Sequence, residues 1–307
     1  MNRRHFLKNM GSGALLLGST GFPLDVLGAT QPEIIKLTIL HTNDVHSRID
    51  SFPMDGTANQ GLGGAAKRMA LLKKIRAQEQ NILLLDAGDI FQGTPYFNFY
   101  GGELEMKLMS QMGYDAATIG NHDFDGGMDS LLKQMGNANF SLLNANYDFS
   151  NTVLNNKIQP YKIFKKGGVK IGVFGVGIEL NGLVPKTLYK ETVYKDPLSI
   201  ANKTATFLKQ EAKCDYVICL SHLGYKYRDE KIDDIKLAKG SQYIDLIIGA
   251  HTHTFMDKPD VFKNKEDKPV MVNQVGWAGI MLGRIDVSFE KTKGDTCASC
   301  QNIYVGK

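Results

Sequence analysis

Short, continuous apolar runs alternate with segments of helical spacing along this 307-residue chain. Ile82–Leu85 and Tyr216–Leu220 are apolar throughout, whereas Gly64–Gln78 has helical spacing and places residues such as Ala65 and Leu72 on one face. A strand that is apolar on both sides needs cover on both faces of its sheet, which flanking helices supply. The pattern therefore predicts the α/β class, with two packed sheets in one domain.

The remaining elements complete this arrangement. Further strands are expected at Ile34–Leu40, Ala116–Ile119, Phe140–Leu143 and Ile244–Ile248, and further helices at Leu104–Met112, Met128–Met135, Pro197–Ala212 and Asp229–Lys239. The Asn-rich residues 144–157 are expected to form a loop. Gly167-Gly168 predicts a hairpin between Tyr161–Lys165 and Val169–Val176, and Val270–Val275 with Ile280–Phe289 are expected to form a closing antiparallel pair, so the sheets should be mixed.

Residues 1–29 have the pattern of a targeting segment. Arg3-Arg4 precedes Phe6-Leu7-Lys8 and the small, weakly apolar stretch from Met10 to Leu17, which is typical of a twin-arginine signal. A Sec signal and a short membrane anchor are the alternatives, but this stretch is shorter than the roughly 20 residues of a spanning helix. Cleavage near Gly28-Ala29 would leave one mature domain over 30–307, periplasmic or extracellular, without a stable membrane anchor.

Charge and cysteine content exclude other classes of function. The net charge is +4, and half of it comes from residues 1–29, so the remainder is too weakly basic for a nucleic-acid polymer as partner. Cys214 and Cys219 border and enter an apolar strand and are expected to be buried thiols. Cys297 and Cys300 are expected to form a local disulfide or an inert surface pair, without redox catalysis.

The histidines of residues 30–307 gather in short polar motifs after the strand-like runs. In α/β proteins ligands bind outside the carboxyl ends of the strands. After Ile34–Leu40, Asp44 and His46 stand two residues apart, so in an extended segment both side chains point the same way. A carboxylate and an imidazole suit a divalent transition metal. A turn-capping Asp44 with a surface His46 is the alternative.

Two further motifs follow the next strands. Gly88 allows a sharp turn after Ile82–Leu85, and Asp89 is a candidate bridging carboxylate or, alternatively, a simple turn residue. After Ala116–Ile119, Asn121 offers a carbonyl ligand and His122 can face a substrate. Asp125 can hydrogen-bond the far nitrogen of His122 or simply cap a helix.

The last two motifs supply three imidazoles. His222 follows Tyr216–Leu220 and is a weak signal alone, whereas His251 and His253 after Ile244–Ile248 form a metal-binding pattern or, alternatively, an exposed turn. Together the motifs provide enough ligands for two metal ions if Asp89 is shared. Two ions roughly 3.5–4 Å apart can clamp a phosphoryl group and lower the pKa of a water molecule.

In this order, the motifs Asn43-Asp44-Val-His46, Gly88-Asp89, Gly120-Asn121-His122-Asp123, Ser221-His222 and Gly249-Ala-His251-Thr-His253 resemble those of the calcineurin-like metallophosphoesterases. Asp86-Ala-Gly-Asp-Ile-Phe-Gln-Gly-Thr94 and Asn121-His-Asp-Phe-Asp125 resemble the 5′-nucleotidase branch of that family. The resemblance extends over residues 35–290. It implies a four-layer α/β/β/α sandwich.

The resemblance also implies a role for each motif residue. One metal would be held by Asp44, His46, Asp89 and His253, and the other by Asp89, Asn121, His222 and His251. His122 and Asp125 would be the catalytic pair. The two divalent ions would be Mn, Zn, Co or Fe.

The implied activity is the hydrolysis of small phosphate monoesters, nucleoside monophosphates above all. Cyclic-nucleotide phosphodiester cleavage, nucleotide-sugar pyrophosphate cleavage and a non-catalytic subunit are the alternatives. Exported 5′-nucleotidases carry a C-terminal nucleotide-binding domain that has no counterpart within this sequence, so a separately encoded domain is a candidate partner. Trp277 and Tyr225 are local candidates for stacking on a base, or else packing residues.

Overall fold

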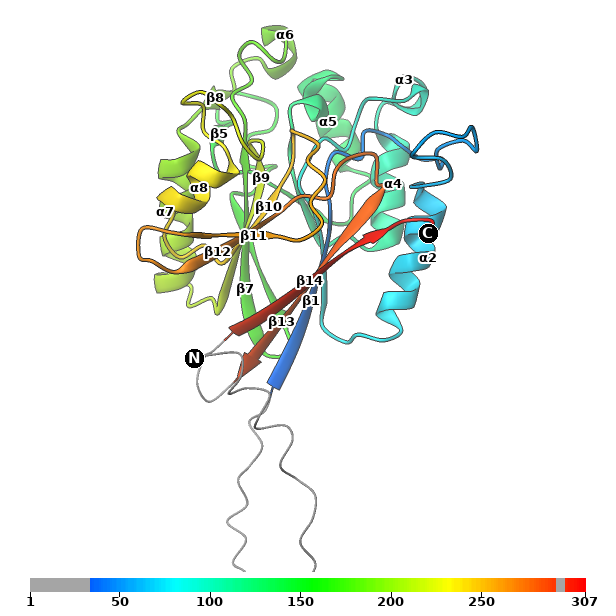
Figure 1. Ribbon diagram of the computed structural model, residues 1–307. Coiled ribbons are helices and arrows are strands. Elements are labelled where there is room, and N and C mark those ends of the chain that lie inside the picture. Colours follow the sequence, from blue (N-terminus) through cyan, green and yellow to red (C-terminus); the bar gives the residue numbers. More distant parts are fainter. Residues whose placement is uncertain (1–33, 291–295) are drawn as a thin grey trace, which may run out of the picture. The chain divides into compact units, whose positions relative to one another are not determined.

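The computed structural model describes residues 34–290 and 296–307, and the expected signal segment lies outside them. Within these residues the chain forms two six-stranded sheets and one two-stranded sheet (Figure 1). The first sheet has the order β14-β13-β1-β2-β3-β4. Its strands are β1 Ile34–Thr42, β2 Ile82–Asp86, β3 Ala116–Thr118, β4 Ser141–Leu143, β13 Met281–Glu290 and β14 Thr296–Tyr304. Strands β1 to β4 run parallel, and β13 and β14 are added antiparallel.

The second sheet has the order β11-β12-β10-β9-β7-β6. Its strands are β6 Tyr161–Lys166, β7 Val169–Gly177, β9 Tyr216–His222, β10 Leu246–Gly249, β11 Asp260–Lys263 and β12 Pro269–Asn273. Its four central strands are parallel and both edge strands are antiparallel. Both large sheets are therefore mixed, and the predicted β6–β7 hairpin is confirmed.

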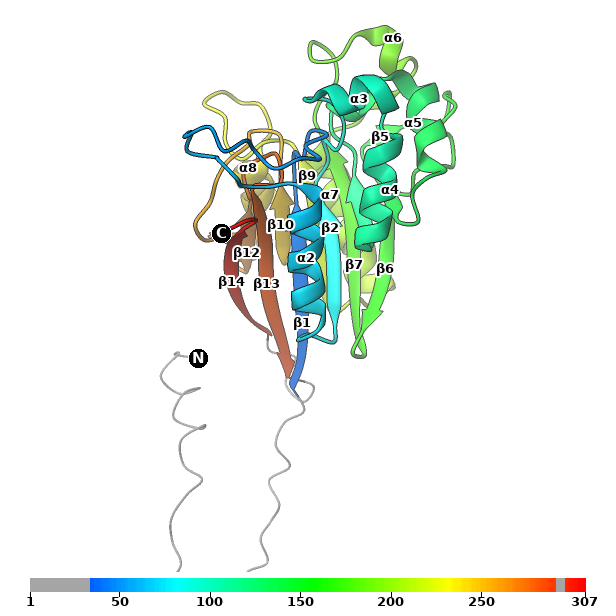
Figure 2. The ribbon, with the colours of Figure 1, turned by 90° about the vertical axis from the view of Figure 1, so that its right-hand side faces the viewer.

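Helices cover the outer face of each large sheet (Figures 1 and 2). Helices α2 (Ala65–Arg76), α4 (Glu103–Met112) and α5 (Gly127–Met135) pack on the first sheet, and α7 (Pro197–Thr206) and α8 (Asp234–Gly240) pack on the second. Short helices α3 (Pro95–Tyr100) and α6 (Lys186–Tyr189) lie in the connections. The four-layer α/β/β/α prediction is confirmed.

Strand β2 shows why the sequence favours this layering. Leu83 and Leu85 pack in the core between the two sheets, whereas Ile82 and Leu84 pack against the helices on the other face. Successive side chains of a strand point to opposite faces, so a strand buried on both faces must be apolar throughout.

The expected closing pair is wrong. Val270–Val275 overlaps β12, which pairs with β10 and β11, whereas Ile280–Phe289 overlaps β13, which pairs with β1 and β14. The intervening residues 274–280 pass from one sheet to the other, with Gly276 and Gly279 at positive φ. A short connection between two apolar runs favours a hairpin only when both runs belong to one sheet.

Several boundaries also differ from expectation. The helix expected from Asp229 begins at Asp234, where the Asp233 side chain accepts a hydrogen bond from the backbone N–H of Lys236. The helix from Pro197 changes into a π-helical turn, Phe207–Glu211. The expected loop 144–157 contains β5 (Tyr147–Asp148), which pairs with β8 (Val193–Tyr194). Helix α3 and strands β11 and β14 were not predicted.

The described thiols are free. Cys214 and Cys219 are buried as predicted, and Cys300 carries a free thiol, so the local disulfide alternative does not hold for it. Over residues 34–290 and 296–307, no helix is long and apolar enough to cross a membrane.

Candidate metal centre

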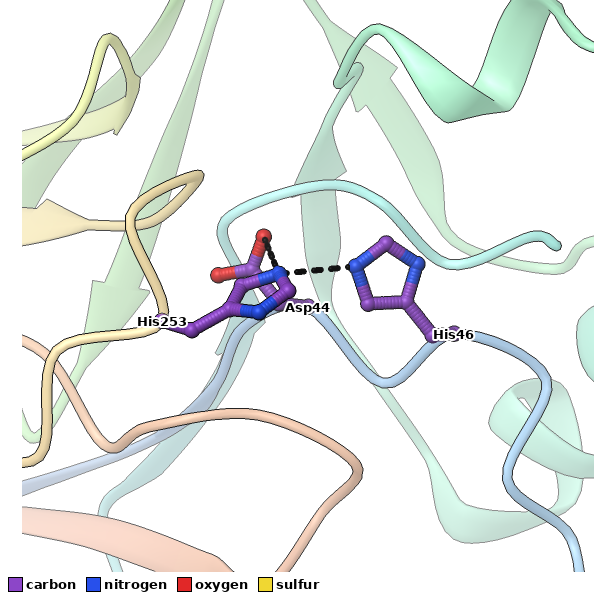
Figure 3. Close-up of side chains that lie close together, drawn as sticks. All are labelled: Asp44, His46 and His253. Carbon is purple, nitrogen blue, oxygen red and sulfur yellow. Dashed lines mark hydrogen bonds and ion pairs between the residues drawn. The ribbon is translucent and has the colours of Figure 1, made fainter. Parts of the chain in front are cut away.

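The carboxyl ends of β1, β2, β3, β9 and β10 bring all seven predicted metal ligands to one edge of the sheets. The first group comprises Asp44, His46 and His253 (Figure 3). The Nε2 atoms of His46 and His253 lie 3.0 Å apart, and Nε2 of His253 lies 3.6 Å from Oδ1 of Asp44. Asp44 and His46 come from the segment after β1, whereas His253 comes from the loop after β10 (Figure 3).

The second group comprises Asp89, His222 and His251. Nε2 of His222 lies 3.2 Å from Oδ2 of Asp89, without hydrogen-bond geometry. Nδ1 of His222 lies 2.8 Å from the carbonyl oxygen of Ala87, which directs Nε2 toward Asp89. Oδ2 of Asp89 also lies 3.8 Å from Nε2 of His46, so this carboxylate lies between the two groups, as predicted for a bridging ligand.

Among the buried polar atoms that lack a hydrogen-bond partner in the described residues are Oδ1 of Asn121 and Nε2 of His222, both on predicted metal ligands. Buried polar groups are nearly always satisfied, so each such atom calls for a missing partner. Carboxylate oxygens, an amide oxygen and imidazole nitrogens together suit divalent transition metals. The residues therefore fit a dinuclear metal centre.

The pKa values of Asp44 and Asp89 shift in opposite directions. Burial raises the pKa of Asp44 well above its usual value. Burial is also the largest effect on Asp89 and acts in the same direction, but the combined interactions with His222, His46 and His122 outweigh it and hold the pKa of Asp89 below its usual value. For His222, burial is the largest effect and lowers the pKa, but the combined interactions with Asp89, Asp44 and the carbonyl oxygen of Ala87 outweigh it and raise the pKa.

The backbone at the site is strained. Asp44, His46, Asp89, His251 and His253 have φ angles of 49°, 51°, 55°, 70° and 51°. Such left-handed conformations of non-glycine residues cost of order 1–3 kcal/mol each and cluster at functional sites. Local hydrogen bonds stabilise this strained conformation. The backbone N–H of Asp44 donates to the carbonyl oxygen of Gly88, and that of His46 donates to the carbonyl oxygen of Asp89.

Glycine is required where the second and third motifs meet. A Cβ atom at Gly88 would lie 2.7 Å from the backbone nitrogen of Gly120, and one at Gly120 would lie 2.1 Å from Oδ1 of Asp89. Neither position has room for a side chain, so these glycines let the Asp89 and Asn121 loops touch.

Asp123 supports the Asp89 loop in a way that sequence reasoning missed. Its buried carboxylate accepts hydrogen bonds from the backbone N–H groups of Asp89, Ile90, Phe91 and Gly120, at 2.8–3.1 Å. It thereby joins the strained turn after β2 to the loop after β3. Asp123 stood within a recognised motif, but nothing in the spacing indicated that it binds backbone amides.

Asp234 and Gln274 support the other side of the site and were also missed. Asp234 accepts hydrogen bonds from the Ser221 hydroxyl at 2.5 Å and from Nε2 of Gln274 at 3.0 Å. Gln274 also donates to the carbonyl oxygen of Ala250 and accepts from the backbone N–H of Thr254. This buried network fixes the two loops that carry His222, His251 and His253.

The predicted His122–Asp125 pair is brought together. Nδ1 of His122 lies 2.8 Å from Oδ2 of Asp125, and the half-exposed imidazole ring lies 5.3 Å from the ring of His46. The hydrogen bond to Asp125 raises the pKa of His122. With Nδ1 engaged, Nε2 is the atom available for proton transfer.

The two expected stacking candidates lie in different surroundings. The indole of Trp277 stacks on the His253 imidazole, with centroids 5.8 Å apart and an interplanar angle of 10°. Tyr225 donates its hydroxyl hydrogen to the carboxylate of Asp260, and its backbone N–H donates to the Thr252 hydroxyl. Only Trp277 therefore contacts a candidate ligand through its ring.

Comparison with known proteins agrees with this site. A family model described as calcineurin-like phosphoesterase matches residues 37–255. The chain is 34% identical over 301 residues to the trifunctional nucleotide phosphoesterase protein YfkN of Bacillus subtilis, which covers 88% of this chain and 19% of that protein. It is 33% identical over 291 residues to a snake venom 5′-nucleotidase of Gloydius brevicauda, which covers 87% of this chain and 47% of that protein.

A solved structure has the same fold. The 5′-nucleotidase precursor of Thermus thermophilus superposes with a TM-score of 0.79 at 31% identity, over 88% of this chain and 55% of that one. The chain thus spans about half the length of the two 5′-nucleotidases. The family model matches most of the chain, and the matched residues include every motif of the site described above. The protein therefore belongs to the calcineurin-like phosphoesterase family of metal-dependent phosphoester hydrolases.

Proposed function

We propose that this protein hydrolyses small phosphate monoesters, with nucleoside 5′-monophosphates as the preferred class. The observation that carries the proposal is the convergence of two three-residue groups beside the His122–Asp125 pair. Asp89 of the second group also lies 3.8 Å from His46 of the first. The similarity to 5′-nucleotidases supports the nucleotide as substrate. Because the chain spans only about half of those proteins, the choice of nucleotide belongs to the proposal.

We assign the ligands of the two cations to the groups of the site. Asp44, His46 and His253 would hold one ion, His222, His251 and Asn121 would hold the other, and Asp89 would be shared. Two divalent cations there would neutralise charge on the phosphoryl oxygens and lower the pKa of a water molecule.

His122 is assigned the proton transfer. Asp125 holds Nδ1, so a proton at Nε2 faces the site and is available to the leaving alkoxide oxygen of the ester. The raised pKa of His122 keeps more of this imidazole protonated near neutral pH. Partial exposure of the ring gives a substrate access to it.

A substrate panel tests the proposal. Metal-loaded protein would be assayed on p-nitrophenyl phosphate, its bis ester, nucleoside monophosphates, cyclic nucleotides and nucleotide sugars. We expect the nucleoside monophosphates to give the highest kcat/KM, and chelation to abolish the activity. Faster cleavage of the bis ester than of the monoester would contradict the monoesterase proposal.

A broader nucleotide phosphoesterase is the second candidate. The similarity to a protein named as a trifunctional nucleotide phosphoesterase favours it. Comparable kcat/KM values for monoester and cyclic diester substrates in the same panel would support this candidate over the first.

We also propose that residues 1–29 direct export through the twin-arginine route, since Arg3-Arg4 precedes a short, weakly apolar stretch. Fusion of residues 1–29 to a reporter would test this. Export should be lost when Arg3 and Arg4 are both replaced by Lys, and continued export of that variant would contradict the route.

A further inference from the structure

We propose that Trp277 is a positioning residue that fixes the imidazole plane of His253, and that its fluorescence therefore reports occupancy of the first metal group. This inference rests on the dinuclear centre proposed above. It assigns a role to a residue outside the five motifs that follow β1, β2, β3, β9 and β10. Trp277 belongs to the segment between β12 and β13, which crosses from one sheet to the other.

His253 needs an orienting partner. Metal-binding histidines usually donate their second ring N–H to a carboxylate or a carbonyl, which fixes the ring. His222 has such a contact through Ala87, and Nδ1 of His46 lies 3.3 Å from the carbonyl oxygen of Phe91. For His253, Nε2 contacts His46 and Asp44, the His46 ring meets the imidazole edge-on with centroids 4.9 Å apart, and Trp277 stacks on its face. Since His46 belongs to the same metal group, the near-parallel indole is the contact from outside that group that restrains the plane of the His253 ring.

Trp277 is itself held from behind. Phe52 meets the indole edge-on, with centroids 5.9 Å apart, and the Arg48 guanidinium lies 4.3 Å from the Phe52 ring centroid. Both aromatic rings pack on a small buried cluster formed by Leu62, Val275, Ala278, Ile280 and Met281. The backbone N–H of Ala278 donates to the carbonyl oxygen of Asp44, which ties the Trp277 segment to the first group. The Trp277 indole is thus held in place and offers a fixed surface to the His253 imidazole, whose backbone is strained.

A spectroscopic test follows because Trp277 is the single tryptophan of the sequence. Zinc has a filled d shell, so a change in emission on zinc binding would reflect the altered surroundings of the indole. Metal-stripped protein would be titrated with Zn²⁺ at pH 7, with bound zinc measured by equilibrium dialysis. We expect the emission to change with one of the two bound equivalents. Constant emission while two equivalents bind would overturn the inference.

Variants test the positioning role. Trp277→Ala should weaken one equivalent of zinc by about tenfold and leave the other unchanged, and Trp277→Phe should restore most of the loss because it keeps a stacking ring. Phe255→Ala is the matched control, since Phe255 bridges to Val275 between the same two segments while its ring lies against Gly276. It should bind both equivalents as the wild type does.

The outcomes separate the two proposals. Unchanged affinities in Trp277→Ala would refute the role of Trp277 and leave the metal centre standing. Failure of the wild type to bind any zinc would refute both. Should Trp277→Ala not fold, Trp277→Leu takes its place, because it keeps an apolar side chain without a stacking ring. One weakened equivalent in that variant would support the role of Trp277, and unchanged affinities would refute it.

Discussion

The carboxylate of Asp123 accepts a hydrogen bond from the backbone N–H of Asp89 at 3.0 Å, so one acidic residue holds another in a strained conformation at the centre of the site. The same carboxylate binds the N–H groups of Ile90, Phe91 and Gly120. An acidic side chain that is saturated by backbone donors acts on the loop and need not contact the substrate.

The first prediction concerns this loop. Asp123→Asn places an amide NH₂ against backbone donors and leaves at least one of them unsatisfied, which costs about 1–3 kcal/mol. We expect lower thermal stability and weaker metal binding by Asp89. Differential scanning calorimetry and metal analysis would measure both. Stability and metal content equal to the wild type would show that the four hydrogen bonds are dispensable.

The second prediction tests the shared ligand. Asp89→Ala removes the carboxylate that lies 3.2 Å from Nε2 of His222 and 3.8 Å from Nε2 of His46. We expect both metal equivalents to be lost, whereas His253→Ala should retain one. Elemental analysis of dialysed protein would measure the content. If Asp89→Ala kept one tight equivalent, Asp89 would belong to a single group and would not be a bridge.

Sequence predicted much of this edge because its residues follow a simple rule. Each candidate ligand comes at or shortly after the end of a parallel strand, and parallel strands deliver their carboxyl ends to one side. The pairing of the motifs after β1 and β10, which belong to different sheets, came from the resemblance to the family, and Asp44 and His253 do lie together. The metal roles themselves stay predictions.

The supporting residues could not be predicted in the same way. Asp234 lies in helix α8 and Gln274 follows β12. The two residues are 40 positions apart in the sequence, yet their side chains form a hydrogen bond. The expectation of an antiparallel pair was wrong in the same region, because Val270–Val275 and Ile280–Phe289 belong to different sheets. Residues 274–280 cross between the sheets, and Trp277 in this segment contacts His253. Long-range contacts of this kind leave no periodic signal in the sequence.

The third prediction addresses proton transfer. His122→Ala should lower kcat by about 10²–10⁴-fold, the usual effect of losing a general acid or base, while both metal equivalents remain bound. Steady-state kinetics with parallel metal analysis would measure this. A normal kcat in the metal-loaded variant would remove His122 from the reaction.

The fourth prediction concerns Asp125 and the pH profile. Its hydrogen bond raises the pKa of His122, so Asp125→Asn should lower that pKa. The protonated donor exists below this pKa and is lost as the pH rises through it. The alkaline limb of kcat should therefore move to lower pH in Asp125→Asn. An unmoved limb, with kcat merely reduced at every pH, would assign the limb to another group.

The fifth prediction concerns stability and Asp234. Burial raises its pKa from 3.8 to about 7, although Ser221 and Gln274 donate hydrogen bonds to it. Between these two values the folded state holds a proton that the unfolded state has released, so raising the pH through this window destabilises the fold. Asp234→Asn cannot release that proton. The stability of the wild type relative to Asp234→Asn should therefore fall by up to about 1.4 kcal/mol per pH unit.

Urea unfolding of both proteins at pH 5, 6 and 7, with chelator present, would measure this difference, and the exposed neighbour Asp229→Asn serves as the control substitution. Because Asp234→Asn also alters the hydrogen bonds of Ser221 and Gln274, it should be less stable at every pH, and the slope of the difference is the decisive quantity. Parallel pH dependences for wild type and Asp234→Asn would mean that Asp234 is already ionised in the fold at pH 5. In that case the network that fixes the His222 and His251 loops would carry a buried charge, stabilised by its two donors.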